Sequence, residues 1–495
     1  MKSLDLANYT PIPTVYQLRY AILKKIQVGE DPLPDIQGRE EVKRDVLRAL
    51  LSGSHPYLVS EEGTGKTRLA RAVAKLLPPV PVIKGCPYND DPKWPRHMLC
   101  PRCRQSEDPI KEFGVEIKSG EKRFSRIQGN EYTNEAKLLG LKDIQAIAQG
   151  RSPSDPLVFT GTGIFRANRG ILFIDELPAI RTKVQVLLHP VLEEKKAILE
   201  EYNFEHPLDL ILIATGNPQG FSHVNEVPRP LLDRLELIYM DLPEWETERE
   251  IMLRERFRVR EDYFAQEEEA PAMPRISLEE LERRVLVPAW IIDLINGAVR
   301  HSRRCRFLDK RASIRGSIRA LDHTASNLEL EGRSVGNLRD ALTGLRLSLR
   351  GRVGLRADLV DFENPRETLR KTDEVIEDLL WNALEDYDLP LDVERERFRN
   401  ETVSLLSERL DGVSQRIGRF KELSKLVETL KKMEESRSGG ELGRLLRTKG
   451  AEVVLDGLVY SAVETIMNVA VHRRLIDPTL LEGRVFLPKQ VRALS

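Results

Sequence analysis

Short apolar runs alternate with helix-type patterns between residues 36 and 243 of the chain. The runs are short and rich in branched side chains, as strands buried on both faces of a sheet are. They are YLVS at 57–60, VPVI at 80–83, GILFID at 170–175, LILIAT at 210–215 and LIYMDL at 237–242. Strands that alternate with helices predict an α/β domain with a parallel sheet over residues 36–243.

The strand pattern ends after residue 243, where helical spacing of apolar residues takes over. We expect helices in residues 244–355 and again in residues 356–495, where EDLLWNALEDY and RFKELSKLVETLKKM carry apolar residues at helical spacing. A short helical lead-in, residues 1–35, precedes the α/β domain. The chain is therefore expected to combine one α/β domain with a large helical part.

Charge is balanced along the 495 residues, since 77 Lys and Arg face 78 Asp and Glu. This balance argues against a surface that binds nucleic acid through its overall charge, although it leaves a local basic patch open. Four cysteines are too few for a disulfide framework in a chain of this length. No signal-peptide pattern is seen and no segment approaches a membrane span, so we expect a cytoplasmic protein without a membrane partner.

Residues 59–68 read VSEEGTGKTR and are similar to the phosphate-binding pattern G-x-x-x-x-G-K-[ST]. Lys66 and Thr67 match its last two positions, but Ser60 stands where the pattern has its first glycine. An expected strand precedes the loop and an amphipathic helix, KTRLARAVAKLL, follows it, which is the context that such a loop requires. The sequence therefore predicts a working phosphate loop with serine in place of one glycine.

The residue types of this loop suit ATP bound together with Mg²⁺. Backbone N–H groups at the start of a helix bind phosphate oxygens, and glycines let the backbone approach closely. We expect Lys66 to neutralise phosphate charge and the Thr67 hydroxyl to bind Mg²⁺. The predicted nucleotide-binding residues of the loop are Gly63, Thr64, Gly65, Lys66 and Thr67.

Polar side chains also follow two further expected strands. Asp175 and Glu176 end the run GILFIDE, and Asn217 follows the run LILIAT. Because α/β sheets bind ligands at the carboxyl ends of their strands, these side chains are expected beside the phosphate loop. We expect Asp175 to bind Mg²⁺ and the nucleotide, Glu176 to act as general base on the attacking water, and Asn217 to orient that water.

Longer segments resemble the AAA+ ATPases of the magnesium-chelatase ATPase subunit and MoxR type, in the helix-2-insert clade. They are GCPYNDDP at 85–92, LLGLKDIQAIAQG at 138–150, RANRGILFIDE at 166–176, EHPLDLILIATGNP at 205–218 and RPLLDR at 229–234. The resemblance covers roughly residues 36–330. It implies an AAA+ domain with an insert at about 138–168, a helical lid at 244–355 and a homo-oligomeric ring, usually a hexamer.

The same resemblance assigns roles to two arginines. Arg234, the last residue of RPLLDR, would be the arginine finger that enters the ATP site of a neighbouring subunit. A fixed positive charge at the transferred phosphate suits that role. RASIRGSIRA at 311–320 resembles the sensor-two motif of the lid, which would place Arg315 on the γ-phosphate, with Arg319 as an alternative.

Three of the four cysteines lie close together in CPYNDDPKWPRHMLCPRC. The spacing of CPRC is common in zinc sites, and Cys86 and His97 could complete a tetrahedral set with Cys100 and Cys103. Buried or free thiols in a reducing compartment are the other interpretation. The sequence leaves both open.

The sequence leaves three functions open for the expected motor. The resemblance favours a ring that remodels or activates a partner protein, one with a von Willebrand factor A domain. A magnesium-chelatase subunit is less favoured, because residues 356–495 continue past the expected lid and the residues after IDE differ from the chelatase pattern. A nucleic-acid or transcription-complex motor would suit the FTG of VFTGTGIF at 158–165, which resembles part of a sigma-54 activator motif, but the composition lacks a basic bias.

Overall fold

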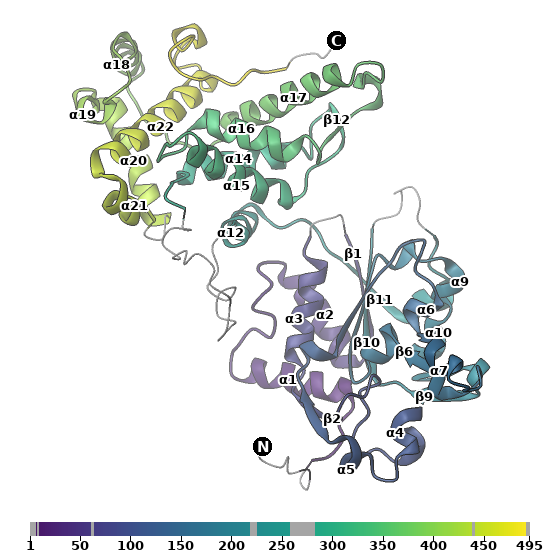
Figure 1. The fold of residues 1–495 in the computed structure, drawn as a ribbon. Coiled ribbons are helices and arrows are strands. Elements are labelled where there is room, and N and C mark those ends of the chain that lie inside the picture. Colours follow the sequence, from purple (N-terminus) through teal and green to yellow (C-terminus); the bar gives the residue numbers. More distant parts are fainter. Residues whose placement is uncertain are drawn as a thin grey trace. The chain divides into compact units, whose positions relative to one another are not determined.

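A computed structural model describes residues 6, 9–60, 64–217, 225–257, 283–437 and 441–491 of the chain. The chain divides into two compact units, Met1–Glu244 and Trp245–Ser495 (Figure 1). The division separates a sheet-containing unit from an almost wholly helical one.

A five-stranded sheet forms the centre of the first unit. Its strands, in spatial order, are β11 (Leu235–Tyr239), β1 (His55–Val59), β10 (Leu210–Gly216), β7 (Gly170–Asp175) and β4 (Phe124–Gln128). Every neighbouring pair is parallel. All residues of β10 are buried, as are those of β7 up to its last residue, because helices and loops cover both faces. The predicted α/β fold with a parallel sheet is confirmed.

Alternate residues of the central strands face two separate cores. Ile171, Phe173, Ile211 and Ile213 pack with the helices α1 (Thr14–Gln27), α2 (Glu40–Ser52) and α3 (Lys66–Leu76), which lie together on one side of the sheet (Figure 1). The residues between them, such as Leu172 and Leu212, pack against the segments that follow β2. This two-sided burial explains why the strands are apolar throughout.

One strand prediction needs correction, and one strand of the central sheet was not predicted. Residues 80–83 do form a strand, β2 (Val80–Ile83), but it pairs antiparallel with β3 (Val115–Lys118) outside the central sheet. The strand that completes the sheet, β4, was not predicted. Its residues FSRIQ alternate between buried and more exposed positions, as expected for an edge strand with one open face. A short alternating run of this kind gives a much weaker signal than a fully apolar one.

The remaining elements of the first unit are short. The expected insert, 138–168, contains the antiparallel pair β5 (Gly140–Lys142) and β6 (Phe159–Gly161) with α7 (Ile144–Ala148) between them. The boundaries of this insert stay a prediction. The other elements are α4 (Pro101–Gln105), α5 (Pro109–Phe113), α6 (Glu135–Leu138), α8 (Gly163–Arg166), α9 (Thr182–Gln185), α10 (Leu188–Glu193), β8 (Lys196–Leu199), β9 (Phe204–Pro207) and α11 (Arg229–Leu232).

Helices pack around one continuous apolar core in the second unit. Its members come from both expected parts, 244–355 and 356–495, so the boundary between a lid and an extension stays a prediction. One small strand pair, β12 (Leu308–Lys310) with β13 (Gly354–Leu355), accompanies the helices. The helices are α12 (Trp245–Glu255), α14 (Ala289–His301), α15 (Ile314–Leu330), α16 (Leu338–Leu349), α17 (Pro365–Glu385), α18 (Arg395–Ser407), α19 (Val413–Arg416), α20 (Lys421–Arg437), α21 (Glu441–Lys449) and α22 (Ala451–His472).

Helix α22 corrects the expectation that no segment approaches a membrane span. It has 22 residues and contains an 18-residue window with a mean hydropathy of 1.4, enough to cross a membrane by length and composition, and 72% of that window is buried. Helices α16, α17, α20 and α21 contact it. A helix that is mostly buried among other helices is apolar on most of its surface, which accounts for its composition.

A buried carboxyl group joins α22 to α16. Glu464 on α22 is 1% exposed, and its Oε2 accepts a hydrogen bond from the backbone N–H of Leu338 at 2.8 Å. Its other oxygen, Oε1, has no hydrogen-bond partner within the described part of the chain. Burial raises the pKa of Glu464 to about 8. The folded protein therefore favours the protonated acid.

We expect the stability of the second unit to fall as the pH rises from about 5 to about 8. Over that interval the unfolded chain has already released the Glu464 proton, whereas the folded chain holds it until the pH approaches the folded pKa of about 8. Glu464→Gln should remove a pH-dependent change on the order of 1–3 kcal/mol in the free energy of unfolding. Urea unfolding at several pH values measures it, with the exposed Glu363→Gln as control. An unchanged pH slope in Glu464→Gln would contradict the assignment.

Candidate active site

The predicted phosphate loop connects the end of β1 to the start of α3. Gly65 has φ 91°, a left-handed conformation that favours glycine, and Lys66 begins the helix. Ser60, at the position of the missing glycine, is buried, and its hydroxyl lies 2.5 Å from the Thr64 hydroxyl. Serine is therefore accommodated at the end of β1, where its hydroxyl forms a hydrogen bond with another residue of the loop. The predicted Gly63 lies outside the described residues.

Oxygen atoms at the carboxyl ends of β1 and β10 hold the Lys66 ammonium group. Its Nζ donates to the carbonyl of Ser60 at 2.8 Å, the carbonyl of Gly216 at 3.3 Å and Asn217 Oδ1 at 3.3 Å. Thr67 follows as the second residue of α3, half-buried. A cation and a helix N-terminus meet at this edge of the sheet, which is an arrangement that binds phosphate.

The two predicted acids lie at the end of β7, next to β10. Thr215, fully buried on β10, connects them: its Oγ1 donates to Asp175 Oδ1 at 2.9 Å and accepts from the Glu176 N–H at 2.8 Å. Glu176 has φ 61°, which is uncommon for a residue with a side chain and is concentrated at functional sites. Thr215 therefore fixes both acids at once.

The positioning role of Thr215 was not predicted, although its sequence carries a signal. It is a polar residue in a strand that is otherwise apolar, and a buried hydroxyl needs hydrogen-bond partners. A second residue that was missed is Arg126 on β4, whose Nη2 donates to Asp175 Oδ2 at 2.6 Å. It was missed because β4 itself was not predicted. Arg39 was missed as well, and its guanidinium donates to the Thr64 carbonyl.

These side chains fit ATP with Mg²⁺. Lys66, Thr67 and the start of α3 form a cradle for phosphate, and Asp175 supplies an oxygen of the kind that Mg²⁺ prefers. Arg126 holds one oxygen of that carboxylate, so a metal ion at Asp175 would share the carboxylate with Arg126 or displace it. Asn217 lies beside Lys66 through the hydrogen bond between their side chains.

Arg234 lies at the opposite edge of the sheet from Lys66. It directly precedes β11, whose first residue, Leu235, is in register with His55, the first residue of β1. Its guanidinium pairs with the Glu193 carboxylate and the Pro230 carbonyl. A five-residue strand separates the two edges by roughly 15 Å at about 3.3 Å per residue. Arg234 is therefore not brought into the site of its own chain.

Comparison with known proteins agrees with this geometry. Residues 117–235 match the family described as AAA domain (dynein-related subfamily). Residues 117–235 of the first unit therefore resemble an AAA domain. The chain is 29% identical over 216 residues to the magnesium-chelatase 38 kDa subunit of Cereibacter sphaeroides, covering 42% of this chain and 57% of that protein. It is 30% identical over 211 residues to magnesium-chelatase subunit ChlI of Nostoc sp., covering 41% and 52%.

The chain thus spans about half the length of these curated relatives. A solved structure of the complex between subunits BchI and BchD of magnesium chelatase aligns at 21% identity and a TM-score of 0.35, covering 69% of this chain and 98% of the other. The predicted resemblance to the magnesium-chelatase ATPase subunit is confirmed.

Outside the AAA+ domain, Arg315 lies in the second unit, exposed in the first turn of α15. Arg319, one turn later, is also exposed and lies 3.4 Å from Asp322. Both belong to a different unit from the phosphate loop, so the sensor role of Arg315 stays a prediction.

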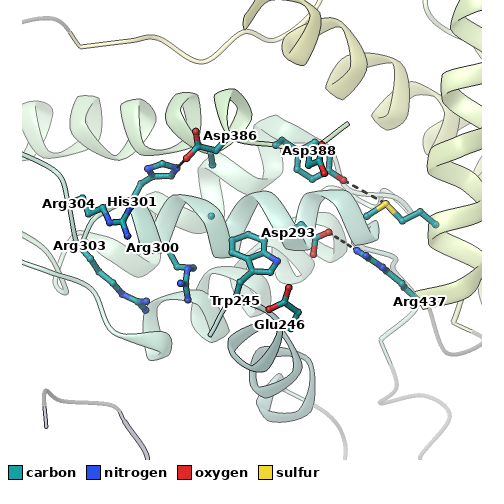
Figure 2. A pocket seen from close by; sticks show the side chains of 14 residues that line it. Trp245, Glu246, Asp293, Arg300, His301, Arg303, Arg304, Asp386, Asp388 and Arg437 are labelled. Carbon is teal, nitrogen blue, oxygen red and sulfur yellow. Dashed lines mark hydrogen bonds and ion pairs between the residues drawn. The ribbon is translucent and has the colours of Figure 1, made fainter. Parts of the chain in front are cut away.

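A cavity of about 550 Å³ lies within the second unit (Figure 2). Its charged lining residues form ion pairs between elements: Asp293 with Arg437 at 2.9 Å, and His301 with Asp386 at 3.2 Å. Arg300 reaches Glu248 on α12 at 2.6 Å. The pairs of Asp293 and Arg300 link α14 to α20 and to α12, respectively. The charged side chains around the cavity therefore hold helices together, and this was not predicted from the sequence.

The predicted zinc ligands are only partly brought together. Cys86, Cys100 and Cys103 lie in one buried cluster, but His97 is exposed in a 3₁₀ turn, Arg96–Met98. The inclusion of His97 is therefore wrong, because this turn places the residue on the surface. Asp90, which was not predicted, takes the fourth position in the cluster.

We expect Thr215→Val to lower kcat for ATP hydrolysis by about 10–100-fold, with nucleotide affinity changed by less than about threefold. The substitution keeps the volume but removes the hydrogen bonds to the Asp175 carboxylate and the Glu176 backbone, and these are the acids expected to act on Mg²⁺ and the attacking water. Thr215→Ser, which keeps the hydroxyl, should retain most activity, whereas Lys66→Ala should lose nucleotide binding as well. Steady-state kinetics with a fluorescent-nucleotide titration separate the two effects. Wild-type kcat in Thr215→Val would contradict the positioning role.

Proposed function

We propose that the chain is a Mg²⁺-dependent ATPase that works as a ring and uses hydrolysis to remodel or activate a partner protein. The observation that carries the proposal is the separation between Arg234 and the ATP site of its own chain. Lys66, Thr67, Asp175, Glu176 and Asn217 gather at the carboxyl edge of the sheet, while Arg234 lies at the amino edge. A second copy of the chain can supply the missing arginine.

The chemistry follows from the groups at the carboxyl edge. Lys66 binds and neutralises the phosphates, and Thr67 and Asp175 would hold Mg²⁺, which would supply further positive charge on the phosphate oxygens. Glu176 accepts the proton of the attacking water, and Asn217 orients that water. The water oxygen bonds to the γ-phosphorus while the bond to the bridging oxygen of ADP breaks. Arg234 of a neighbouring subunit stabilises the charge that develops on the transferred phosphate.

A ring also explains why Arg234 is held in place before any neighbour arrives. Its ion pair with Glu193 on α10 fixes the guanidinium next to α11, at a partly exposed position. A pre-positioned arginine loses less side-chain freedom when it enters a site. The interface is then heterologous, with one edge of each subunit facing the other edge of the next, and such interfaces form a ring when the rotation between subunits closes. Six subunits is the number that the resemblance implies.

Mixed rings test this arrangement. Arg234→Ala keeps an intact phosphate site, and Glu176→Gln keeps an intact arginine, so each protein alone should be nearly inactive. An equal mixture should recover about a quarter of wild-type activity, the fraction of interfaces that pair the two intact halves. Lys66→Ala mixed with Glu176→Gln is the control, because both defects lie in the same half and should give no recovery. A mixture no more active than its components would contradict a role for Arg234 across the interface.

The partner is proposed to be a protein with a von Willebrand factor A domain. The insert offers a place for it, since Leu141 and Ile144 on β5 and α7 are 57% and 77% exposed. Exposed apolar residues on a small hairpin are suited to contact with another protein. Service as a magnesium-chelatase ATPase subunit is the second candidate, supported by the named relatives. Nucleic acid as the partner is less favoured, because the overall charge is balanced.

Glu176→Gln should trap the partner, because it binds ATP but hydrolyses it slowly. Capture from a lysate of the native host with ATP, followed by mass spectrometry, should enrich a von Willebrand factor A-domain protein. Lys66→Ala is the matched control, since it lacks the ATP-bound state. Substitution of both Leu141 and Ile144 by serine should reduce capture without lowering basal ATPase activity. Enrichment of polymerase or nucleic acid instead would overturn the proposed partner class.

A further inference from the structure

Four buried groups lie together at the amino edge of the AAA+ domain, far from the phosphate loop along the strands. They are the thiols of Cys86, Cys100 and Cys103 and the carboxyl group of Asp90, each at most 1% exposed. One ligand atom from each lies within 4.8 Å of all the others. The three thiols are free, so no disulfide accounts for the cluster.

The spacing of the cluster fits ligands around one ion. Cys86 Sγ lies 3.7 Å from Cys100 Sγ, well beyond the roughly 2.05 Å of a disulfide bond. A tetrahedral zinc ion with Zn–S bonds of about 2.3 Å separates its sulfur ligands by about 3.8 Å. The two distances agree closely. The sulfur atoms are thus already at the separation that a shared metal would impose.

Backbone hydrogen bonds hold these ligands in place. The Cys100 N–H donates to Asp90 Oδ2 at 2.7 Å, and the Cys103 N–H lies 3.5 Å from Cys100 Sγ. Such bonds orient metal ligands and stabilise their charged forms. They arise because Cys100 is the N-cap of α4, whose first turn carries Cys103. The CPRC segment therefore folds into a turn that presents both sulfurs to the same point.

Asp90 gives a second, independent indication of a ligand. Its Oδ1 is buried and has no hydrogen-bond partner within the described ranges. The His206 ring nitrogen Nε2 is 3.6 Å from this oxygen, too far for a good hydrogen bond. A buried carboxylate oxygen without a partner is costly, and a bound cation would satisfy it.

We propose that Cys86, Asp90, Cys100 and Cys103 bind one Zn²⁺ ion. Three thiolates with one carboxylate form a tetrahedral set that suits zinc better than the oxygen-preferring Mg²⁺ or Ca²⁺. All four positions are filled by protein, which is typical of a structural rather than a catalytic zinc site. The ion would also offset the negative charge that four buried acidic groups would otherwise carry.

The surroundings of the cluster show what the ion stabilises. Asn89 Nδ2 donates to the carbonyls of Arg166 and Asn168, at 2.9 and 3.1 Å, and Asn168 Nδ2 donates to the Tyr88 carbonyl at 2.9 Å. Beside them, Asp91 and Arg169 form a buried ion pair at 2.5 Å. These bonds tie the loop between Cys86 and Asp91 to the residues directly before β7. Zinc therefore anchors the chain where it enters the strand that ends in Asp175.

Metal analysis tests the site in full-length protein purified without chelators or a metal-affinity tag. Wild type should contain about one zinc per chain, and His97→Ala, the matched control, should contain the same amount. Cys100→Ser and Asp90→Asn should contain much less. Less than about a tenth of a zinc per chain in reduced wild type, with no uptake of added Zn²⁺, would overturn the proposal. Loss of zinc in His97→Ala but not in Asp90→Asn would also overturn it.

Cobalt keeps the proposal testable if the cysteine variants fail to fold. Co²⁺ added to reduced, metal-free wild type should give the intense near-ultraviolet absorption of cobalt bound to thiolates, together with a tetrahedral visible spectrum. Removal of zinc by a chelator should lower the thermal midpoint of the first unit. It should leave nucleotide affinity of the protein that remains folded within about twofold, because the ion lies at the other edge of the sheet. An octahedral spectrum without thiolate bands would contradict ligation by the three cysteines.

Discussion

The candidate site depends on one buried hydroxyl, which joins the two central strands at their carboxyl ends. Thr215 on β10 bonds both Asp175 and the backbone of Glu176 on β7. Without that bond, the left-handed backbone of Glu176 would lose one of its supports, and such conformations cost on the order of 1–3 kcal/mol. Parallel pairing of β10 with β7 brings the three residues into register, so the sheet itself sets the geometry of the acids.

The parts of this protein that could be predicted from the sequence are those with local signals. The fully apolar runs of β7 and β10 report burial on both faces, and the loop before Lys66 has a fixed pattern of residue types. β4 could not be found in this way, because an edge strand carries polar residues on its open face. The role of Arg126 could not be predicted either, because its contact with Asp175 exists only through the pairing of two distant segments, β4 and β7.

The cysteine cluster and α22 show the same limit in different forms. Spacing along the chain made His97 a natural ligand, but the chain turns outward there, and Asp90 reaches the thiols because its loop folds back on Cys100. Helix α22 is as apolar as a membrane span because other helices surround it. In each case the role of a residue or segment depends on its tertiary contacts. Neither the spacing of residues nor their hydropathy reports those contacts.

The two edges of the central sheet have different proposed roles. The carboxyl edge holds the groups predicted to bind the nucleotide, whereas the amino edge holds Arg234 before β11 and, beside the residues that precede β7, the loop of the cysteine cluster. Strands are stiff along their length, so a group at the amino edge cannot reach the nucleotide of its own chain. In the proposed ring, hydrolysis is then a property of each interface rather than of each subunit. An ion bound by the proposed cysteine site would hold the loop that contacts the residues before β7, so its role would be structural although it lies far from the phosphate loop.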